Sequence, residues 1–370
     1  MVKILHVISD KNIGGAVRLL LNLLAEADRG LFDFSVILPH GSLLKPEIQS
    51  LSVKVIESGL GFFELYRIIG NENPQIVHTH AAATARIAAK LRGAVTVNTR
   101  HCASEESGKI PPYKKAATRL FDALFTNATV ATAHYVKSVL MREGIPENKI
   151  FVIINGCTPI PKRSEQEKLE IRHRLGYSKD DFLAGMIARL EEGKGQETFI
   201  EAARICQKSA PQIKFLIAGN GSAEPQLKSQ AQALDNLKFL GFLPDVTEIM
   251  NVIDANVNCS YISETSSLSL SEGMSVGAIP VVSDCGGNRF MADDCGVIFP
   301  KKDAKALAEA LINLSRSKAE KHRLSSASRQ KFATLLTAKR MAKETENLYL
   351  GLLKSALRID KALKIWLNKI

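Results

Sequence analysis

The stretch ISETSSLSLSEGMSVGAIPVVSDCGGN, residues 262–288, decides the fold of the second half of the chain. It begins with a polar loop that carries Glu264, and residues 268–276 then predict a helix that contains Glu272. The buried-looking run AIPVVSD and two glycines follow. A helix that leads directly into a near-continuous apolar strand is typical of a parallel sheet covered by helices.

Similar apolar runs recur along the whole chain, from KILHVIS, FSVILP and VKVIES near the start to ANVNCS, IPVVSD and GVIFP near the end. Between most of them lie stretches of helical period, such as residues 16–27, 81–91, 196–206 and 304–314. Strands of this kind separated by helices indicate parallel sheets covered on both faces. The pattern predicts an α/β protein with two Rossmann-like, doubly wound parallel-sheet domains facing a cleft.

The alternation breaks at NGCTPIP, residues 155–161, where two prolines and a glycine precede a polar segment. Such a segment is typical of a hinge between domains. We therefore expect a first domain over residues 1–158, a second over 159–335, and C-terminal helices over 336–370. In sheets of this type, ligands bind at the carboxyl ends of the strands where the strand order reverses.

Composition excludes several classes of protein. A chain of 370 residues is too long for one ordinary core, and 45% apolar with 24% charged residues is typical of a soluble globular protein. No run reaches eighteen apolar residues, and the first residues lack the features of a signal peptide. Six scattered cysteines predict reduced thiols in a cytoplasm and no zinc site.

The stretch MIARLEEGKGQETFIEAA, residues 186–203, follows a predicted strand and opens a predicted helix. Arg189 and Lys194 lie on either side of a glycine-rich turn, and two cations beside a helix N-terminus suit a pyrophosphate. On position alone, solvated loop charges are the commoner outcome. The turn is not a Walker A loop, because Gly195 stands where Ser or Thr would bind magnesium.

A second glycine-containing turn, IAGNGSAEPQL at residues 217–227, holds Gly219, Asn220 and Gly221. The glycines allow the backbone to approach a partner closely. The third glycine and the acid of a dinucleotide fingerprint are absent, so a dehydrogenase is poorly supported. A plain tight turn and a ligand loop fit the pattern equally well.

In the opening stretch, Thr265, Ser266, Ser267 and Leu268 fall at the N-terminus of the predicted helix, where unpaired N–H groups favour an anion. Small side chains there leave room for a phosphate. Glu264 and Glu272 have seven residues between them, and acids so placed suit sugar hydroxyls and a ribose. For a random pair of acids, helix capping or surface charge is the simpler interpretation.

These motifs together resemble the family 4 retaining glycosyltransferases of GT-B fold. The resemblance rests on the order R-x₄-K-G, GNG, LGFLPDVTEIM, E-x₇-E and GMSVGAIPVVSDCGG, and it covers essentially the whole chain. Asn12-Ile13-Gly14-Gly15-Ala16 resembles the GGA loop of the family, and His101 in TRH resembles its fifth-strand histidine. Where the family commonly has Glu-Gly-Phe-Gly, this chain has Glu264-Thr265-Ser266-Ser267.

The resemblance implies a role for each motif. Arg189 and Lys194 would hold the donor diphosphate, Glu264 the transferred sugar and Glu272 the ribose. The Gly14-Gly15 loop would meet the donor or acceptor, and His101 would lie beside the reacting centre, although a lone histidine is usually a core residue. The first domain would be the acceptor side, the second the nucleotide-sugar side, and the terminal helices would pack back on the first.

The expected function is metal-independent transfer of a sugar, with retention, from a UDP-sugar to a glycan or lipid-linked cell-envelope acceptor. No D-x-D motif is present to hold a metal, and no cofactor is expected besides the nucleotide-sugar substrate. The alternatives are a GDP-mannose-dependent mannosyltransferase, a UDP-sugar 2-epimerase of similar architecture, and a non-catalytic nucleotide-sugar-binding protein. Nucleic acid is not an expected partner.

The net charge of +11 is concentrated in two segments. Residues 335–370 hold eight Lys or Arg against three acids, and residues 100–120 hold five against two. In residues 109–125, basic side chains alternate with Leu and Phe, which is typical of a helix in an anionic membrane interface. The apolar stripe Ala356, Ile359, Leu363, Trp366 and Ile370 of the tail is expected to pack on a core instead. The predicted location is cytoplasmic, with peripheral attachment to the inner face of the membrane.

Overall fold

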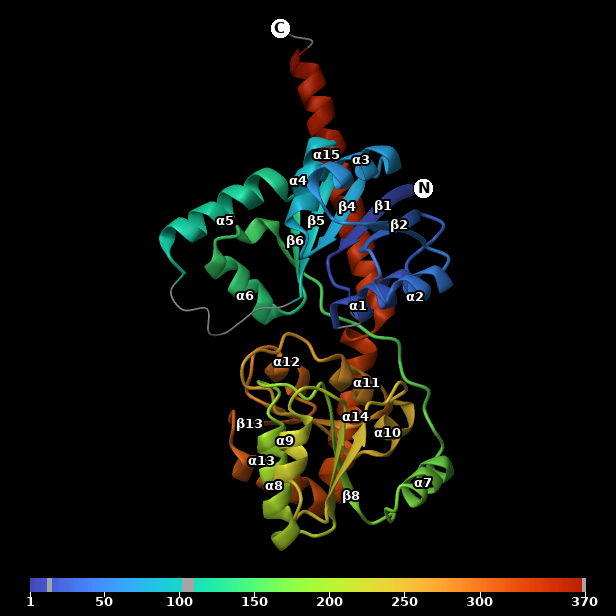
Figure 1. Ribbon diagram of the computed structural model, residues 1–370, viewed down its shortest axis with the longest axis vertical. Helices are drawn as coiled ribbons and strands as arrows, with labels where there is room; N and C mark the ends of the chain where they lie inside the picture. The colour runs from blue at the N-terminus through green and yellow to red at the C-terminus, as the bar shows by residue number, and fades with distance from the viewer. Residues whose placement is uncertain (12–14, 102–109, 368–370) are drawn as a thin grey trace. The chain divides into compact units, whose positions relative to one another are not determined.

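The chain folds into two units, each built on its own parallel sheet. The computed structural model describes residues 1–11, 15–101 and 110–367, with side chains as far as Leu357, that of Ala16 excepted. The first unit contains residues up to Gly156 and returns at Ala338, and the second spans Cys157–Thr337. Both are shown in Figure 1, and each is described by itself.

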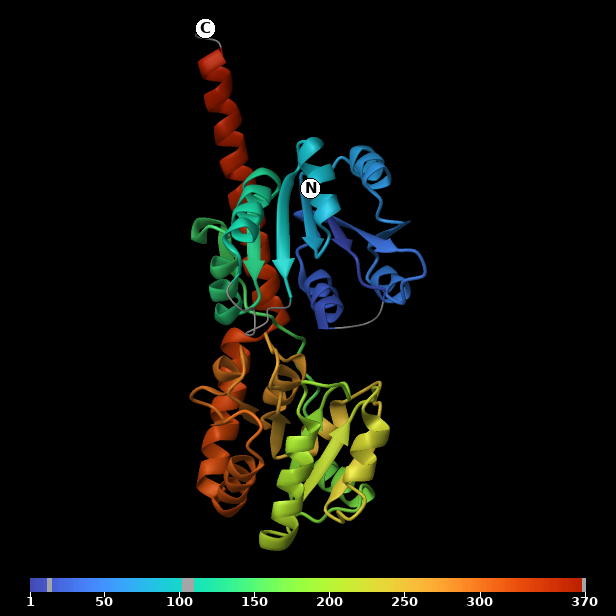
Figure 2. The ribbon, with the colours of Figure 1, turned by 60° about the vertical axis from the view of Figure 1, so that its left-hand side comes forward.

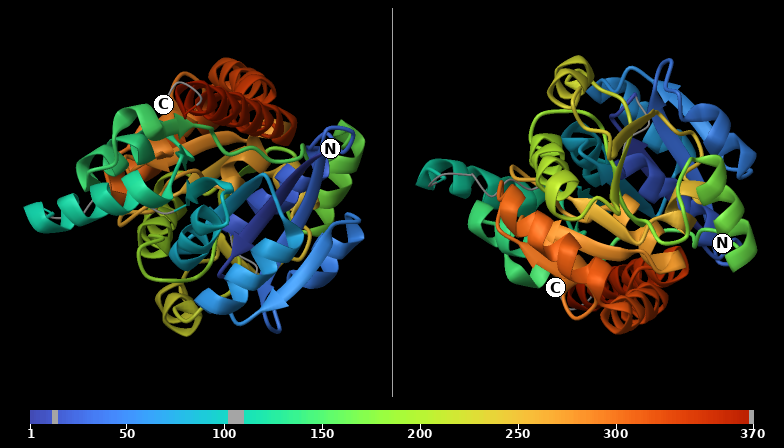
Figure 3. Two further views of the ribbon diagram at one scale, coloured as in Figure 1. Left: turned by 90° about the horizontal axis from the view of Figure 1, so that it is seen from above. Right: turned by 90° about the horizontal axis from the view of Figure 1, so that it is seen from below.

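The first unit has a seven-stranded sheet in the order β3-β2-β1-β4-β5-β6-β7, with every neighbouring pair parallel. Its strands are β1 (Val2–Ile8), β2 (Phe32–Pro39), β3 (Lys54–Ser58), β4 (Ile76–His80), β5 (Val95–Arg100), β6 (Ala128–Ala131) and β7 (Ile150–Val152). Its helices are α1 (Gly15–Glu26), α2 (Lys45–Ser50), α3 (Phe62–Glu72), α4 (Ala83–Leu91), α5 (Pro112–Phe125), α6 (His134–Glu143) and α15 (Ala338–Leu367). Figure 3 (left) shows these strands, blue to green, twisted against one another.

The two faces of this sheet differ in polarity. On one face, Leu5, Val7 and Val77 pack against apolar residues of α3 and α4. The opposite face carries His6 and His78, which are register partners on β1 and β4, and it is covered by α1 and α15. Because successive strand residues point to opposite faces, the sequence HTH at 78–80 places two histidines on this second face.

Helix α15 ties the end of the chain into the first unit. Tyr349 is fully buried, donates or accepts a hydrogen bond with His78 and packs edge-on against Phe32. Glu346 accepts a hydrogen bond from the Asp28 backbone N–H. In the expected tail stripe, Ala356 is half-buried, and the side chains of Ile359, Leu363, Trp366 and Ile370 lie outside the described residues.

The second unit has a six-stranded parallel sheet in the order β10-β9-β8-β11-β12-β13. Its strands are β8 (Phe182–Ile187), β9 (Ile213–Ala218), β10 (Leu237–Gly241), β11 (Ala255–Asn258), β12 (Ile279–Ser283) and β13 (Val297–Phe299). Its helices are α7 (Glu165–Arg174), α8 (Gln196–Ser209), α9 (Glu224–Gln230), α10 (Thr247–Val252), α11 (Leu268–Val276), α12 (Asn288–Ala292), α13 (Ala304–Arg316) and α14 (Lys318–Leu335).

Helices cover both faces of this second sheet. Apolar residues of α8, α9 and α13 pack on one face, and those of α7, α10 and α11 pack on the other. Figure 2 shows α13 and α14 side by side, in orange and red. The predicted helix at 268–276 coincides with α11, and the run AIPVVSD contains β12, so the opening stretch folds as its pattern indicates.

Candidate active site

The loops that carry Lys194 and Glu264 emerge side by side from the second sheet. Chain order runs from β8 outward through β9 to β10, and from β11 outward through β12 to β13. The strand order therefore reverses between β8 and β11, and a parallel sheet offers its ligand crevice at the carboxyl ends of such a pair. Lys194 follows β8 and Glu264 follows β11.

The Glu264 carboxylate is held by three donors. Its Oε2 accepts hydrogen bonds from Lys194 Nζ at 3.1 Å, from Asn258 Nδ2 at 3.2 Å and from Ser260 Oγ at 3.1 Å. The side chain is only 12% exposed. Burying a carboxylate costs free energy unless it is paired and hydrogen-bonded. These three donors therefore fix the position of the Glu264 side chain.

A second layer of polar side chains holds the first. The Asn258 Oδ1 atom accepts from the Ser260 N–H at 3.0 Å and from Asn288 Nδ2 at 3.2 Å. Ser283 Oγ donates to the Ser260 carbonyl. Ser283 and Asn288 are fully buried, so the network reaches from the Glu264 carboxylate into the core.

The paired glycines after β12 allow this loop to sit against the sheet. The Gly287 N–H donates to the Glu264 carbonyl at 2.8 Å. A Cβ atom at Gly286 would lie 2.1 Å from that carbonyl oxygen, and one at Gly287 would lie 1.8 Å from the Thr265 oxygen. No side chain fits in either place, which explains the two glycines of SDCGG.

The loop after β8 is tied to the loop after β11 in the same way. The Tyr261 N–H donates to the Gly193 carbonyl at 2.9 Å. Gly195, at φ +77°, begins α8, and a Cβ there would lie 2.2 Å from the Cys259 oxygen. Lys194 sits between these two glycines, so the backbone on both sides of it is fixed.

Arg189 and Lys194 lie in the same loop but point to different surroundings. The Arg189 side chain is 70% exposed and pairs with Glu191 at 3.0 Å. Its carbonyl accepts from the buried Gln196 side chain at 2.7 Å, so the backbone is anchored. The structure thus brings Lys194, and not the Arg189 guanidinium, to the Glu264 carboxylate.

The glycine pair of the GNG turn approaches protein backbone. A Cβ at Gly219, at φ +137°, would lie 1.9 Å from the Ala188 oxygen, and one at Gly221 would lie 2.2 Å from the Leu190 oxygen. The Asn220 carbonyl accepts from the Leu190 N–H at 2.8 Å. Beside this contact lies a cavity of about 140 Å³, lined by Ile187, Ala188, Arg189, Ala218, Gly219, Asn220, Phe242, Leu243 and Val246.

Helix α11 presents its N-terminus directly after the Glu264 loop. Ser267 is its N-cap, with Oγ accepting from the Leu270 N–H at 3.3 Å. The Leu268 N–H begins the helix, where the first amides lack intrahelical acceptors and favour an anion. Within the part of the chain that the structure describes, the buried Ser266 Oγ has no hydrogen-bond partner. Glu272 is the fifth residue of α11 and half-buried.

In the first unit, Gly15 begins α1 and is exposed, whereas Gly14 lies outside the described residues. His101 follows β5, and desolvation lowers its pKa to about 4, so the imidazole is neutral at pH 7. Its Nε2 lies 2.8 Å from His80 Nδ1.

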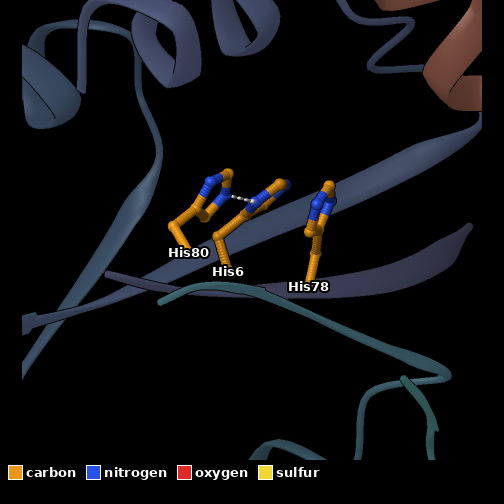
Figure 4. A group of neighbouring side chains, drawn as sticks. All are labelled: His6, His78 and His80. Atoms are coloured by element: carbon orange, nitrogen blue, oxygen red, sulfur yellow. Dashed lines mark hydrogen bonds between the residues drawn. The ribbon is translucent and has the colours of Figure 1, made fainter. Parts of the chain in front are cut away.

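His6, His78 and His80 are buried in the same unit, and Figure 4 shows their rings side by side. Burial, with the neighbouring imidazoles adding to it, holds the pKa of His6, His78 and His80 well below the usual value. None of these three histidines was predicted from the sequence to belong to a site. The H-x-H pair at 78 and 80 does indicate two histidines on one face of a strand, whereas the sequence gives no such signal for His6.

Comparisons with known proteins identify the family. The family described as "Glycosyl transferases group 1" matches residues 167–331, and "Glycosyltransferase Family 4" matches residues 13–159. The chain belongs to this family of glycosyltransferases, and the predicted family and enzyme class are confirmed.

Relatives and solved structures agree. The chain is 28% identical to the Escherichia coli UDP-Gal:alpha-D-GlcNAc-diphosphoundecaprenol alpha-1,3-galactosyltransferase. The alignment covers 72% of this chain and 73% of that relative. It is also 27% identical to the putative glycosyltransferase EpsD of Bacillus subtilis, over 55% of this chain and 54% of that protein. Anabaena HepE in complex with UDP superposes with a TM-score of 0.81, covering 94% of this chain and all of that one at 18% identity. The predicted GT-B fold is confirmed.

No helix among the described residues is long and apolar enough to cross a membrane.

The neutral histidines predict how stability depends on pH. Below about pH 6.5 the histidines of the unfolded chain become protonated, whereas the buried rings of the folded protein stay neutral. Their contribution to the free energy of unfolding is therefore fully present above that pH and is lost as the pH falls. Each such histidine changes the free energy of unfolding by up to about 1.4 kcal/mol per pH unit. Calorimetric midpoints between pH 7.5 and 5.5 should fall, less steeply in His6→Leu. The exposed control His173→Gln should match wild type, and an unchanged slope in His6→Leu would contradict the assignment.

Proposed function

We propose that this chain transfers a sugar, with retention, from a UDP-sugar to a lipid-linked or glycan acceptor of the cell envelope. The observation that carries the proposal is the Lys194–Glu264 pair at the point where the strand order reverses. A cation, a hydrogen-bonding carboxylate and a helix N-terminus meet there, and a nucleoside diphosphate joined to a sugar needs these three groups.

Catalysis would rest on stabilising the leaving group. As the glycosidic bond breaks, the diphosphate gains negative charge, and preorganised cations and N–H dipoles stabilise it best. Lys194 and the first amides of α11 are already fixed, and the exposed Arg189 can reach a phosphate by leaving Glu191. Glu264 would accept from the hydroxyls of the transferred sugar, and Glu272 from the ribose.

The remaining predicted contacts are proposed on the same basis. Ser266 has a buried hydroxyl to offer, whereas that of Ser267 is engaged as a cap, so Ser267 would contribute through its position. The cavity beside the GNG turn suits the planar base. The other proposed donor or acceptor contacts are Gly14, Gly15, His101, Gly219, Asn220, Gly221, Thr265 and Leu268.

The donors of two related proteins support uridine as the base. The Escherichia coli relative uses UDP-Gal by name, and HepE is described in complex with UDP-glucose. GDP-mannose is the second candidate, because an O-antigen chain mannosyltransferase of Escherichia coli is 30% identical over 44% of this chain. The third candidate is a UDP-sugar 2-epimerase. Such an enzyme would convert the UDP-sugar without any acceptor.

The test is a donor panel with mass spectrometry. The protein is offered UDP- and GDP-sugars with and without a polyprenyl-diphosphate-sugar acceptor. Acceptor-dependent release of UDP, with a product heavier by one hexose or N-acetylhexosamine, supports the proposal. Release of GDP only, or an isomerised sugar without acceptor, would replace it by the corresponding alternative.

Removal of either cation should reduce turnover without unfolding the protein. Losing one charged donor to a transition-state anion costs roughly 3 kcal/mol, or about a hundredfold in kcat. Arg189→Ala and Lys194→Ala are compared with Arg204→Ala, a helix-surface arginine of the same unit. Wild-type turnover in either site variant would exclude the diphosphate assignment.

The two acids should separate in their effects. Glu264→Gln keeps the size of the side chain but weakens its contacts to sugar hydroxyls, so kcat should fall while affinity for UDP is kept. Glu272→Ala should weaken UDP binding, by roughly tenfold for one lost charged hydrogen bond. Calorimetric titration with UDP distinguishes them, and unchanged affinity in Glu272→Ala would remove the ribose role.

Helix α5 supports a membrane-bound acceptor. Tyr113, Leu120 and Leu124 are 70%, 61% and 51% exposed, and their spacing of seven and four places them on one face. The exposed Lys114, Lys115 and Arg119 surround this stripe. The one acid of α5, Asp122, is buried, so the exposed helix is basic.

Such a helix should bind an anionic lipid surface, where each basic residue contributes about 1 kcal/mol. In co-sedimentation, binding should require anionic vesicles, fall with salt, and weaken at least tenfold in Lys114→Glu/Lys115→Glu. The control Lys305→Glu/Lys318→Glu makes the same charge change at exposed lysines of the second unit. Equal recovery with neutral and anionic vesicles would favour a soluble acceptor.

A further inference from the structure

The two oxygens of the Glu264 carboxylate have different surroundings. Oε2 accepts three hydrogen bonds, from Lys194 Nζ, Asn258 Nδ2 and Ser260 Oγ. Within the described ranges of the chain, no group donates to the other oxygen, Oε1. That oxygen is also not one of the buried polar atoms without a partner, so it reaches solvent. One oxygen is therefore held by the protein, and the other is open to a ligand.

This division determines which oxygen can meet a sugar. A carboxylate oxygen has two lone pairs, and three donors already surround Oε2. A sugar hydroxyl would have to displace one of these donors to reach Oε2, whereas Oε1 has no such competitor. The hydroxyls that Glu264 is proposed to accept consequently meet Oε1. Their direction then depends on what holds the Oε2 side.

The three donors to Oε2 are not equivalent once a donor substrate binds. Lys194 is also proposed to hold the diphosphate, and a lysine ammonium pairs strongly with phosphate oxygens. A bound diphosphate therefore draws Lys194 away from Glu264. The neutral groups Asn258 Nδ2 and Ser260 Oγ are the donors that stay on Oε2.

The orientation of the Asn258 amide is determined by its own partners. Its Oδ1 accepts from the Ser260 backbone N–H at 3.0 Å and from Asn288 Nδ2 at 3.2 Å. Exchanging oxygen and nitrogen would set Oδ1 against the Glu264 carboxylate and Nδ2 against two N–H donors. All three contacts would then be repulsive, so the network assigns the nitrogen to the carboxylate.

The Asn288 amide is determined in the same way. Its Nδ2 also lies 3.3 Å from the Ser283 carbonyl oxygen, which can only accept. Asn288 is fully buried. The donor and acceptor pattern around Asn258 is thus anchored on two backbone groups, the Ser260 N–H and the Ser283 carbonyl, which cannot exchange roles.

Asn258 also has a rigid position in the fold. It is the last residue of β11 and the register partner of Val282 on β12. Asparagine is depleted in strands, so its presence in the four-residue strand ANVN points to a side-chain role. A group on a strand holds its neighbour more precisely than a group on a loop.

We propose that Asn258 is the positioning residue for Glu264. Its Nδ2 holds Oε2 when Lys194 turns to the diphosphate, so that Oε1 stays directed at the hydroxyls of the transferred sugar. The inference rests on the proposed function, because it takes the sugar contact of Glu264 from there. Asn258 acts through Glu264 and does not itself touch the substrate.

The variant that tests this role is Asn258→Asp. It keeps the size of the side chain and the acceptor for Ser260 and Asn288, but it replaces the donor to Glu264 by a second carboxylate. Like charges at this distance repel, so the Glu264 carboxylate should turn away. The control Asn313→Asp makes the same change at an exposed residue of α13 in the same unit.

The kinetic readout is a panel of monodeoxy analogues of the preferred UDP-sugar. Loss of a hydroxyl bonded to a carboxylate should lower kcat/KM of the wild type by roughly tenfold or more. That penalty should nearly vanish in Glu264→Gln and in Asn258→Asp, for the same analogue, and persist in Asn313→Asp. A variant that only loosened the fold would lower turnover with every donor alike. A penalty lost in Glu264→Gln but kept in Asn258→Asp would overturn the proposal.

Unfolding in urea forms a second arm that needs no catalysis. Asn258→Asp should lower the midpoint concentration more in the wild-type background than in Glu264→Gln, because only the first combination sets two carboxylates against each other. In the double variant the amide and the carboxylate exchange places, so it should fold even if Asn258→Asp alone does not. An equal shift in both backgrounds, or an unfolded double variant, would overturn the contact.

The two arms separate this inference from the proposed function. If Glu264→Gln kept every penalty of the donor panel, the proposed sugar contact of Glu264 would fail. The urea measurements would still decide whether Asn258 holds the Glu264 carboxylate.

Discussion

The ion pair between Lys194 and Glu264 is the contact on which the candidate site depends. It joins the loops that follow the neighbouring strands β8 and β11, in a setting where an unpaired carboxylate would be costly. Asn258 and Ser260 fix the acid, and Ser283 and Asn288 fix those in turn. Glycines on both sides allow the backbones to touch. The result is a charged centre with little freedom before any ligand arrives, as electrostatic stabilisation of a transition state requires.

The first unit contains a buried polar layer of histidines on one face of its sheet. Its sheet has one apolar face, and one face on which imidazoles, a threonine and a tyrosine satisfy one another under α1 and α15. Such a layer is stable only when every ring is neutral, because burial penalises the charged form. Beside it lies a cavity of about 30 Å³, which has room for a water molecule or two.

The sequence predicted the parts of this account that depend on periodicity and on turn chemistry. Residues 268–276 form the expected helix, and the six apolar runs quoted from the two ends of the chain all contain strands. Paired loops at the carboxyl ends could be anticipated from the alternation alone. The sequence could not predict which cation contacts Glu264. Arg189 and Lys194 are equivalent in a linear pattern, and only the folded loop turns the Lys194 side chain toward the carboxylate. The GNG pattern fitted a plain tight turn and a ligand loop equally well, and in the structure its glycines pack closely against the backbone of Ala188 and Leu190. His6 was invisible because it meets His80 only through the register of β1 with β4.

The central proposal is that the diphosphate of a UDP-sugar binds at the carboxyl ends of β8 and β11, where the strand order reverses. A crystal structure of the chain with UDP tests this most directly. The account predicts phosphate oxygens within hydrogen-bond distance of Lys194 Nζ and of the first amides of α11, with the ribose at Glu272. UDP bound away from these groups, with the Lys194–Glu264 pair undisturbed, would contradict it.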